Sequence, residues 1–114
     1  MGDIILNIAK EFSRCPGARY PEEGNYSGQE FREQLLSPKL KEAIESGVHL
    51  YVILDGSAGY ATSFIEESFG GLVREGTYTL QQILDTIVIV SEEDPSYIDD
   101  AKVYMRNAWE HRKV

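Results

Sequence analysis

One segment constrains the fold more than any other. Residues 48–54 are almost uninterruptedly apolar, with His49 as the clear exception. A strand with one face in water alternates apolar and polar residues, whereas a continuous apolar run indicates a strand that is covered on both faces. Such strands are typical of parallel or mixed sheets flanked by helices. We therefore predict that residues 48–54 form the central strand of an α/β fold.

Two further apolar runs predict the neighbouring strands. Residues 3–12 open with a β-branched and apolar run, and residues 86–90 form a second one. An additional edge strand is possible at residues 76–80. The expected fold class is α/β, a small mixed or parallel sheet flanked by helices.

Helix starts are marked by a recurring pair of residues. In a capping box, a Ser or Thr precedes a Glu or Gln by three positions, and each side chain accepts a hydrogen bond from the other residue's amide. The chain has three such pairs: Ser27 and Glu30, Ser63 and Glu66, and Thr79 and Gln82. We expect a helix to begin at each pair, with Thr62 or Ser63 as the cap of the second helix, and a short helix to residue 84 after the third.

Proline and glycine predict further boundaries. Ser37 and Pro38 have the order of an N-cap and a first helical residue, which predicts a separate helix that ends at Gly47. Prolines and glycines between residues 13 and 26 indicate a long loop. After Asp94, apolar residues recur at helical spacing, which predicts an amphipathic final helix with its apolar stripe in the core. The stripe consists of Ile98, Ala101, Met105, Ala108 and Trp109.

Length and composition set the class of protein. The chain has 114 residues, which predicts one domain spanning residues 1–114. Cys15 is the single cysteine, which suits a reducing compartment. No apolar run approaches the roughly 18 residues that a membrane span needs, and the first residues do not resemble a signal peptide. We expect a soluble cytoplasmic protein, without a prediction of its oligomeric state.

The charge is unevenly distributed. Residues 1–41 are balanced, with six basic and six acidic residues, whereas residues 42–114 hold five basic and thirteen acidic residues and carry the whole net charge of −8. An acidic balance opposes direct binding to nucleic acid, because phosphate backbones are bound mainly by Lys and Arg. The acidic clusters are Glu66-Glu67, Glu92-Glu93-Asp94 and Asp99-Asp100.

Catalytic and metal-binding patterns are scarce. His49 and His111 have no visible partners, and Cys15 lacks a base or a resolving cysteine. No pair of Cys or His has metal-ligand spacing, and no phosphate-binding glycine motif is present. We therefore expect no enzyme activity, no metal and no cofactor. Asp55, at the carboxyl end of the predicted central strand, either caps a turn or binds a small ligand.

Two separated motifs carry a resemblance. The first consists of GAR at residues 17–19, SGQEFRE at residues 27–33 and LSP at residues 36–38, and the second of LDG at residues 54–56 and TSFIEESFGGL at residues 62–72. In this order they resemble the STAS-like domains of unknown function of bacteria and phages, over residues 4–90. The resemblance implies a fold related to the STAS domains of anti-sigma-factor antagonists and sulphate transporters, which are not enzymes.

The resemblance also implies a site. In those antagonists a strand that ends in Leu-Asp leads to a serine at a helix N-terminus, and a partner kinase phosphorylates this serine to switch binding off. Leu54 and Asp55 match the strand end, and Ser63 lies nearest to the switching serine; a plain capping role for Ser63 is the alternative. The implied partner-binding residues are Asp55, Thr62, Ser63, Phe64, Glu66, Glu67, Gly70 and Gly71. Charge added at Ser63 or Phe64 is expected to weaken partner binding without unfolding the domain.

A second site is suggested by arginines. Arg14 and Arg19 in the long loop, together with Arg32, would form an anion site at the N-terminus of the helix that Ser27 caps. Pairing with the nearby Glu22, Glu23 or Glu30 is the simpler alternative.

The sequence leaves three functions open. The first is a non-catalytic regulatory module that binds another protein, such as a histidine-kinase-like ATPase. The second is an acidic, phage-type inhibitor that binds a host nuclease or defence complex in place of nucleic acid. The third is a small-molecule sensor that uses the loop after Asp55.

Overall fold

A three-stranded parallel sheet forms one layer of the structure, a computed structural model that describes residues 2–112. The strands are β1 (Ile4–Asn7), β2 (Leu50–Ile53) and β3 (Ile87–Val90), in the order β1-β2-β3. Ile4 pairs with Leu50, and Leu50 with Ile87, so all three strands are in register. The α/β class and the central position of β2 are confirmed, and the sheet is parallel rather than mixed.

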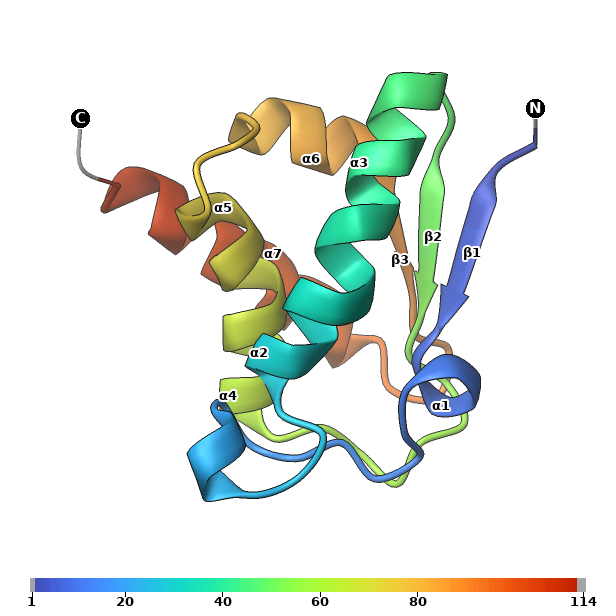
Figure 1. The fold of residues 1–114 in the computed structure, drawn as a ribbon, viewed down its shortest axis with the longest axis vertical. Helices are drawn as coiled ribbons and strands as arrows, with labels where there is room; N and C mark the ends of the chain where they lie inside the picture. Colours follow the sequence, from blue (N-terminus) through green and yellow to red (C-terminus); the bar gives the residue numbers. More distant parts are fainter. Residues whose placement is uncertain (1, 113–114) are drawn as a thin grey trace.

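Helices make up most of the rest of the chain (Figure 1). They are α1 (Ile8–Glu11), α2 (Gly28–Phe31), α3 (Ser37–Ser46), α4 (Thr62–Ile65), α5 (Gly71–Arg74), α6 (Leu80–Thr86) and α7 (Ser96–Glu110). A short 3₁₀ turn, Pro21–Glu23, lies in the loop before α2. Two π-helical turns, Arg32–Leu36 and Glu66–Gly70, join α2 to α3 and α4 to α5. Helical structure is therefore continuous over residues 28–46 and over residues 62–74.

The predicted break at Ser37 is wrong. Ser37 has α-helical dihedral angles, and its amide donates to the carbonyl of Arg32, five residues back. Proline in a helix lacks an N–H and its ring collides with the carbonyl four residues back. The π turn directly before Pro38 widens the helix there, so the chain passes through without a new cap. Gly47 ends this helix in the left-handed conformation, φ +69°, as predicted.

Other boundaries also differ from the prediction. The first strand ends at Asn7, whose side chain accepts a hydrogen bond from the amide of Lys10 (3.1 Å) and caps α1. Within residues 2–112 there is no strand at residues 76–80, where Gly76 turns the chain between α5 and α6 with φ +75°. The capping boxes at Ser27 and Thr79 are confirmed by both of their hydrogen bonds. The helix after Thr79 runs to Thr86, two residues beyond the predicted end.

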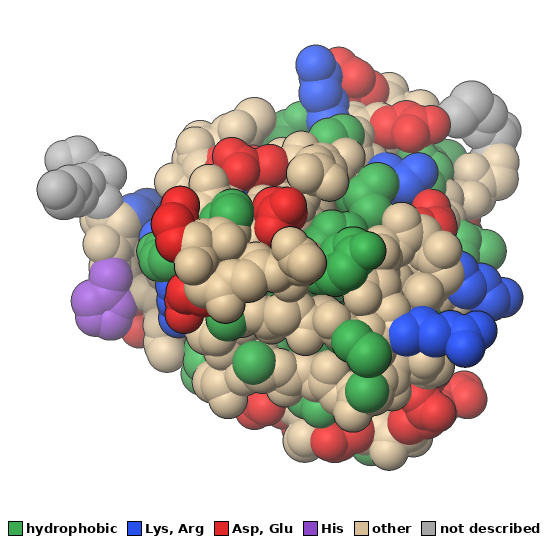
Figure 2. Space-filling model, turned by 60° about the horizontal axis from the view of Figure 1, so that its bottom comes forward, with side chains coloured by type: hydrophobic (Ala, Val, Ile, Leu, Met, Phe, Trp, Pro, Cys, Tyr) green, Lys and Arg blue, Asp and Glu red, His purple; other side chains and the backbone are tan. Residues whose placement is uncertain are grey.

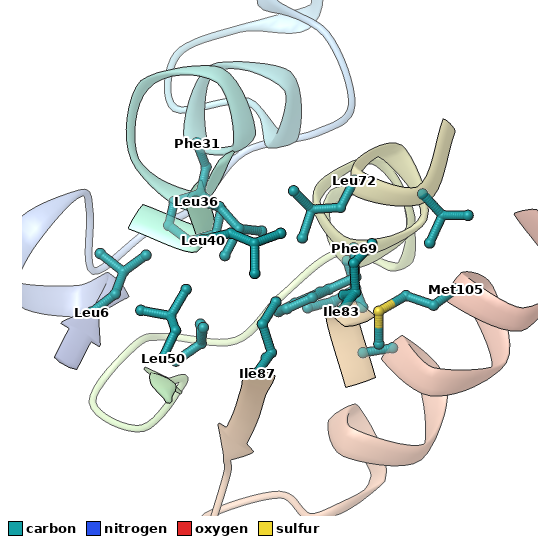
Figure 3. Packing of buried hydrophobic residues seen from close by; sticks show 14 of the residues in the cluster. Leu6, Phe31, Leu36, Leu40, Leu50, Phe69, Leu72, Ile83, Ile87 and Met105 are labelled. Carbon is teal, nitrogen blue, oxygen red and sulfur yellow. The ribbon is translucent and has the colours of Figure 1, made fainter. Parts of the chain in front are cut away.

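The core lies between the helices and one face of the sheet. Leu6, Leu50 and Ile87 from the strands point toward the helices, and side chains of the two continuous helices and of α7 fill the space between (Figure 3). The other sheet face is partly open: Ile5 is 60% exposed and Val88 36% exposed. The prediction that the central strand is covered on both faces is therefore wrong for the outer face, where Tyr51 is only half-buried.

The final helix packs as predicted except at Ile98, which is half-buried and lines a groove beside β3 instead of the core. Ala101, Met105 and Ala108 are buried, and Trp109 packs against the same core from a half-buried position. No helix among residues 2–112 has both the length and the apolar character that crossing a membrane requires.

Candidate functional site

The predicted anion site at the start of α2 is not formed. The loop before α2 uses its own carbonyls to bind the first helical amides: Gly28 donates to Ala18 (2.8 Å) and Gln29 to Arg19 (3.0 Å). The next amide, of Glu30, donates to Oγ of Ser27 (3.1 Å). The first four amides of a helix are its anion-binding groups. Here the amide of residue 31 also donates, to the Ser27 carbonyl, so this helix end offers no free donor.

The three predicted arginines do not converge. Arg14 is exposed, and its carbonyl accepts a hydrogen bond from the amide of Ala58 (2.8 Å). Arg19 and Arg32 instead meet at Glu67, at 3.3 and 2.8 Å. Arg19 and Arg32 are paired, as in the simpler alternative, but with carboxylates of the second continuous helix and of Glu75 at its end, and not with Glu22, Glu23 or Glu30.

These contacts belong to a network of three arginines and three glutamates, which we call the Arg–Glu network. Its members are Arg19, Arg32, Arg74, Glu66, Glu67 and Glu75. Glu67 lies at the centre, with a side chain only 7% exposed and all three guanidinium groups within 3.4 Å. The network is formally neutral and ties the loop before α2, the first continuous helix and the second continuous helix together.

The network also links the two π turns, through the side chain of Arg32 in the first and a backbone carbonyl in the second. Nε of Arg32 donates to the carbonyl of Glu67 (3.1 Å), while its Nη2 binds the Glu67 carboxylate (2.8 Å). A side chain added at Gly71 would collide with the Arg32 guanidinium, and one added at Gly28 would lie 2.8 Å from the Phe64 carbonyl. The glycines therefore permit the close approach of the two continuous helices that brings these charges together.

Proton affinities follow from this pairing. Hydrogen bonds with Glu66 raise the pKa of Arg19 and of Arg74 above the ordinary arginine value. Burial alone would raise the pKa of Glu66, but the hydrogen bonds from Arg74 and Arg19 outweigh burial and hold this pKa below 4.5. All three groups are therefore charged at neutral pH.

A pH dependence of stability follows from Glu66. Because its pKa is lower in the folded than in the unfolded state, its contribution to the free energy of unfolding is fully present well above the ordinary glutamate pKa and is lost as the pH falls through the lower, folded value. Urea unfolding between about pH 3 and pH 7 should show this loss. We expect Glu66→Gln to flatten the acid limb of the curve, and Glu42→Gln, at an exposed position of α3, to leave it unchanged. An unchanged acid limb in Glu66→Gln would contradict the assignment.

The predicted cap of α4 is wrong. Ala61 holds the N-cap position without a side-chain hydrogen bond, and Thr62 and Ser63 are the first two helical residues. The capping box between Ser63 and Glu66 is not formed, because the Glu66 carboxylate binds Arg19 and Arg74. Thr62 is exposed and Ser63 is half-buried. No side chain caps the helix at this end.

Four of the predicted partner-binding residues lie inside the domain. Phe64 is 0% exposed, with its ring centroid 5.7 Å from Phe31 and 5.6 Å from Tyr60. Glu67 is the buried centre of the network, and Gly70 and Gly71 are covered by side chains of the network. These four residues have no surface to offer, which corrects the prediction. Asp55, Thr62, Ser63 and Glu66 remain at least partly accessible.

Asp55 connects two strand ends. Its two carboxylate oxygens accept hydrogen bonds from the amides of Glu92 (3.1 Å) and Glu93 (2.8 Å), which follow β3. In return, the Glu93 carboxylate accepts from the amide of Gly56 (2.6 Å). Asp55 therefore fixes the loop after β3 as well as its own loop, and both of its oxygens already have donors.

A small hollow of about 250 Å³ lies beside Asp55. Tyr60 and Tyr97 form one side, with ring centroids 5.2 Å apart. The Tyr60 hydroxyl donates to the carbonyl of Leu54 (2.7 Å), and burial raises its pKa to about 12. This hydroxyl is a structural donor at neutral pH and not a proton-transfer group.

An exposed surface brings the two predicted regions together at the carboxyl ends of the strands. We call it the loop surface and define it as the exposed and half-buried residues of segments 13–26 and 56–63. The hydrogen bond between Ala58 and Arg14 joins the segments, and Tyr20 and Tyr26 are 43% and 48% exposed. Figure 2 shows this end of the molecule, where hydrophobic side chains lie among polar and backbone atoms, with acidic groups both within the face and at its margins and basic groups at one edge. Sequence reasoning missed the two tyrosines, although both lie in the loop that it singled out.

The other candidate groups are dispersed. His49 lies before β2, with a side chain 55% exposed and Nδ1 3.7 Å from Asp3. His111 follows α7 and contacts the carbonyl of Asn107 (2.8 Å), and Cys15 is exposed. Among residues 2–112 no group of three or more His, Cys, Asp or Glu side chains is arranged to hold a metal ion.

A wider hollow of about 850 Å³ lies between the turn after α5 and the end of α7. Two arginines and a tryptophan line it. Arg74 is bound by Glu66 within the Arg–Glu network, and the Arg112 guanidinium stacks 3.6 Å above the Trp109 ring. Because both arginines already have partners, the loop surface is the better candidate.

The comparisons with known proteins agree with this fold. A family model described as a STAS-like domain of unknown function (DUF4325) matches residues 27–97, from the cap of α2 to the start of α7. The GAR motif at residues 17–19 lies outside the match. No curated protein matches the chain, and no solved structure matches it. Since the match covers more than half of the chain, the protein belongs to the family of STAS-like domains of unknown function.

Proposed function

We propose that the protein is a non-catalytic regulatory module that acts by binding another protein through the loop surface. Membership of a STAS-like family supports a regulatory interaction role. The observation that carries the proposal is the position of the loop surface, which joins two loops at the carboxyl ends of the parallel strands, where open α/β sheets bind their ligands.

The chemistry of the surface suits a protein partner. Tyr20 and Tyr26 are exposed, and Tyr is among the residues that contribute most binding energy at protein interfaces. The Tyr26 ring rests edge-on against Phe12, with centroids 5.5 Å apart, and its backbone is held at φ +60° by a hydrogen bond from Gly17 to its carbonyl. A tyrosine fixed in this way loses little conformational freedom when a partner covers it.

We further propose Ser63 as a regulatory phosphorylation site, with a histidine-kinase-like ATPase as the partner. Ser63 is the second residue of α4, at a helix start with no side-chain cap. The positive end of the helix dipole tolerates a phosphate there. A phosphate adds nearly two negative charges, and the Glu66 carboxylate lies one helical turn further on. Phosphorylation would therefore change the charge of the loop surface while the core remains packed.

The acidic-inhibitor alternative is less well supported. One of its three acidic clusters, Glu66-Glu67, is neutralised by the arginines of the network. The carboxylates of residues 92–94 and 99–100 remain exposed. Binding through those carboxylates alone would weaken steeply with salt, because exposed charges are screened.

The test is affinity capture of the tagged protein from nuclease-treated lysate of its native host, with mass spectrometry of the retained proteins. We expect the unmodified chain and Ser63→Ala to retain the same ATPase, and Ser63→Asp to lose it. Thr77→Asp, at an exposed position between α5 and α6, adds the same charge outside the loop surface and should retain it.

Two outcomes would contradict the proposal. Retention of the partner by a folded Ser63→Asp variant would remove Ser63 from the interface. Recovery of a nuclease whose binding disappears at high salt would favour the acidic inhibitor instead.

A further inference from the structure

Strand β3 has a free edge. The sheet order is β1-β2-β3, so β3 has a strand neighbour on one side only. The Val90 carbonyl accepts from the amide of Leu54 (2.8 Å) and therefore faces β2. Because successive residues of a strand direct their N–H and C=O groups to opposite sides, those of Ile89 point away from the sheet. Unpaired edge groups of this kind are a template for another strand.

A groove runs beside this edge. It has a volume of about 400 Å³ and separates β3 from α7. Figure 3 shows Ile87 and Met105 on these two elements. Most of its lining is apolar, and two basic residues complete it: the lining residues are Leu84, Ile87, Val88, Ile89, Ile98, Lys102, Met105 and Arg106. The groove is thus bounded by a hydrogen-bonding strand edge on one side and by one face of a helix on the other.

The charges of the groove are all of one sign. Lys102 and Arg106 are exposed, and among residues 2–112 neither has a partner in an ion pair or a side-chain hydrogen bond. No acidic residue lines the groove. In a chain of net charge −8 this is a local reversal of sign, and it favours an occupant that carries carboxylates.

We propose that the groove binds an extended, apolar and acidic segment of a partner protein, which pairs with β3 as a fourth strand. The unpaired N–H and C=O groups of Ile89 favour an extended chain, because an extended backbone pairs with a strand edge through main-chain hydrogen bonds. Helix α7 lines the far side of the groove, so the occupant that we propose is a single segment and not the sheet edge of a second copy. The site is separate from the loop surface and does not depend on it.

The spacing of the charges matches such a segment. Lys102 and Arg106 are one helical turn apart on α7, about 6 Å between their Cβ atoms. In an extended chain, alternate residues lie about 6.6 Å apart on the same side. Carboxylates at alternate positions of the segment would therefore reach Lys102 and Arg106 together, while apolar side chains between them meet Ile87 and Met105.

The test uses short random peptides displayed on phage, selected on the immobilised, unmodified chain. We expect the recovered peptides to alternate apolar and acidic residues. As synthetic peptides they should bind about tenfold more weakly to the double variant Lys102→Glu, Arg106→Glu. The control is Lys10→Glu, Lys41→Glu, which makes the same charge change at exposed positions away from the groove and should bind as the unmodified chain does. Thermal unfolding establishes that both variants are folded.

A second measurement reports on the backbone pairing. Addition of peptide should shift the amide resonance of Ile89 in a ¹⁵N-correlated NMR spectrum, and methylation of alternate peptide nitrogens should abolish binding. The proposal is overturned if no peptide is enriched, if the groove variant binds the peptides as well as the control does, or if the Ile89 resonance does not move. It is also overturned if that resonance shifts with protein concentration alone, because the occupant would then be a second copy.

Discussion

Replacement of Glu67 by alanine should destabilise the folded protein by about 3 to 5 kcal/mol, the cost of removing one partner from a buried ion pair. Its carboxylate is 7% exposed and lies within 3.4 Å of three guanidinium groups. Without it, Arg32, whose side chain is 12% exposed, keeps only Glu75 as a charged partner. Chemical denaturation measures the loss.

The matched control is Glu33→Ala. Glu33 is exposed and lies on the first continuous helix, and its removal should change the free energy of unfolding by less than about 0.5 kcal/mol. Equal effects of Glu67→Ala and Glu33→Ala would show that the network contributes nothing to stability. The variant Glu67→Gln separates charge from shape, since it keeps the size of the side chain and removes only the charge.

Replacement of Phe64 by alanine should destabilise the folded protein by about 3 to 5 kcal/mol, roughly the loss measured when a buried phenylalanine is truncated. Phe64 is 0% exposed and packs against Phe31, Tyr60 and Phe12. The measurement is again chemical denaturation, with Tyr26→Ala as the control because Tyr26 is 48% exposed. A folded Phe64→Asp variant of normal stability would contradict the position of this residue and restore it to the candidate surface.

The strands and most helix starts were predictable because their signals are local. The capping boxes at Ser27 and Thr79 each need only a pair of residues three positions apart, and both form. The apolar run at residues 48–54 identified β2 as the central strand. Glycine at position 47 ends its helix for a purely local reason, because a left-handed residue is needed there.

The wrong predictions arose where a residue distant in the sequence binds a side chain that was expected to cap a helix locally. Ser63 and Glu66 have the same spacing as the two boxes that form, but Arg19, 47 positions away, binds the Glu66 carboxylate. Likewise, Ser37 donates its hydroxyl to Glu75 (2.8 Å) instead of capping a helix. A capping box stabilises by at most about 2 kcal/mol, so a partly buried ion-pair network is able to override it.

The candidate site was predictable only in outline. The sequence identified the loop before α2 and the segment after β2, and both contribute to the loop surface. It could not show which side chains of residues 62–71 face inward. Phe64 and Glu67 are three positions apart on one helix and both point into the domain. The charge of Glu67 gave no sign of burial, because two of its three partners, Arg19 and Arg32, are distant in the sequence.

The parallel register of the sheet has a consequence for how the chain folds. Ile4 pairs with Leu50, 46 positions later, and Leu50 pairs with Ile87, 37 positions later. Each pairing closes a long loop, which lowers the conformational entropy of the chain. This loss comes before any ladder hydrogen bond compensates for it. The helices between the strands form from local contacts and shorten the distance that the strand ends must cover. The sheet, although it is the centre of the architecture, is therefore held together by pairings that each close a long loop, and we expect it to form after the local helices.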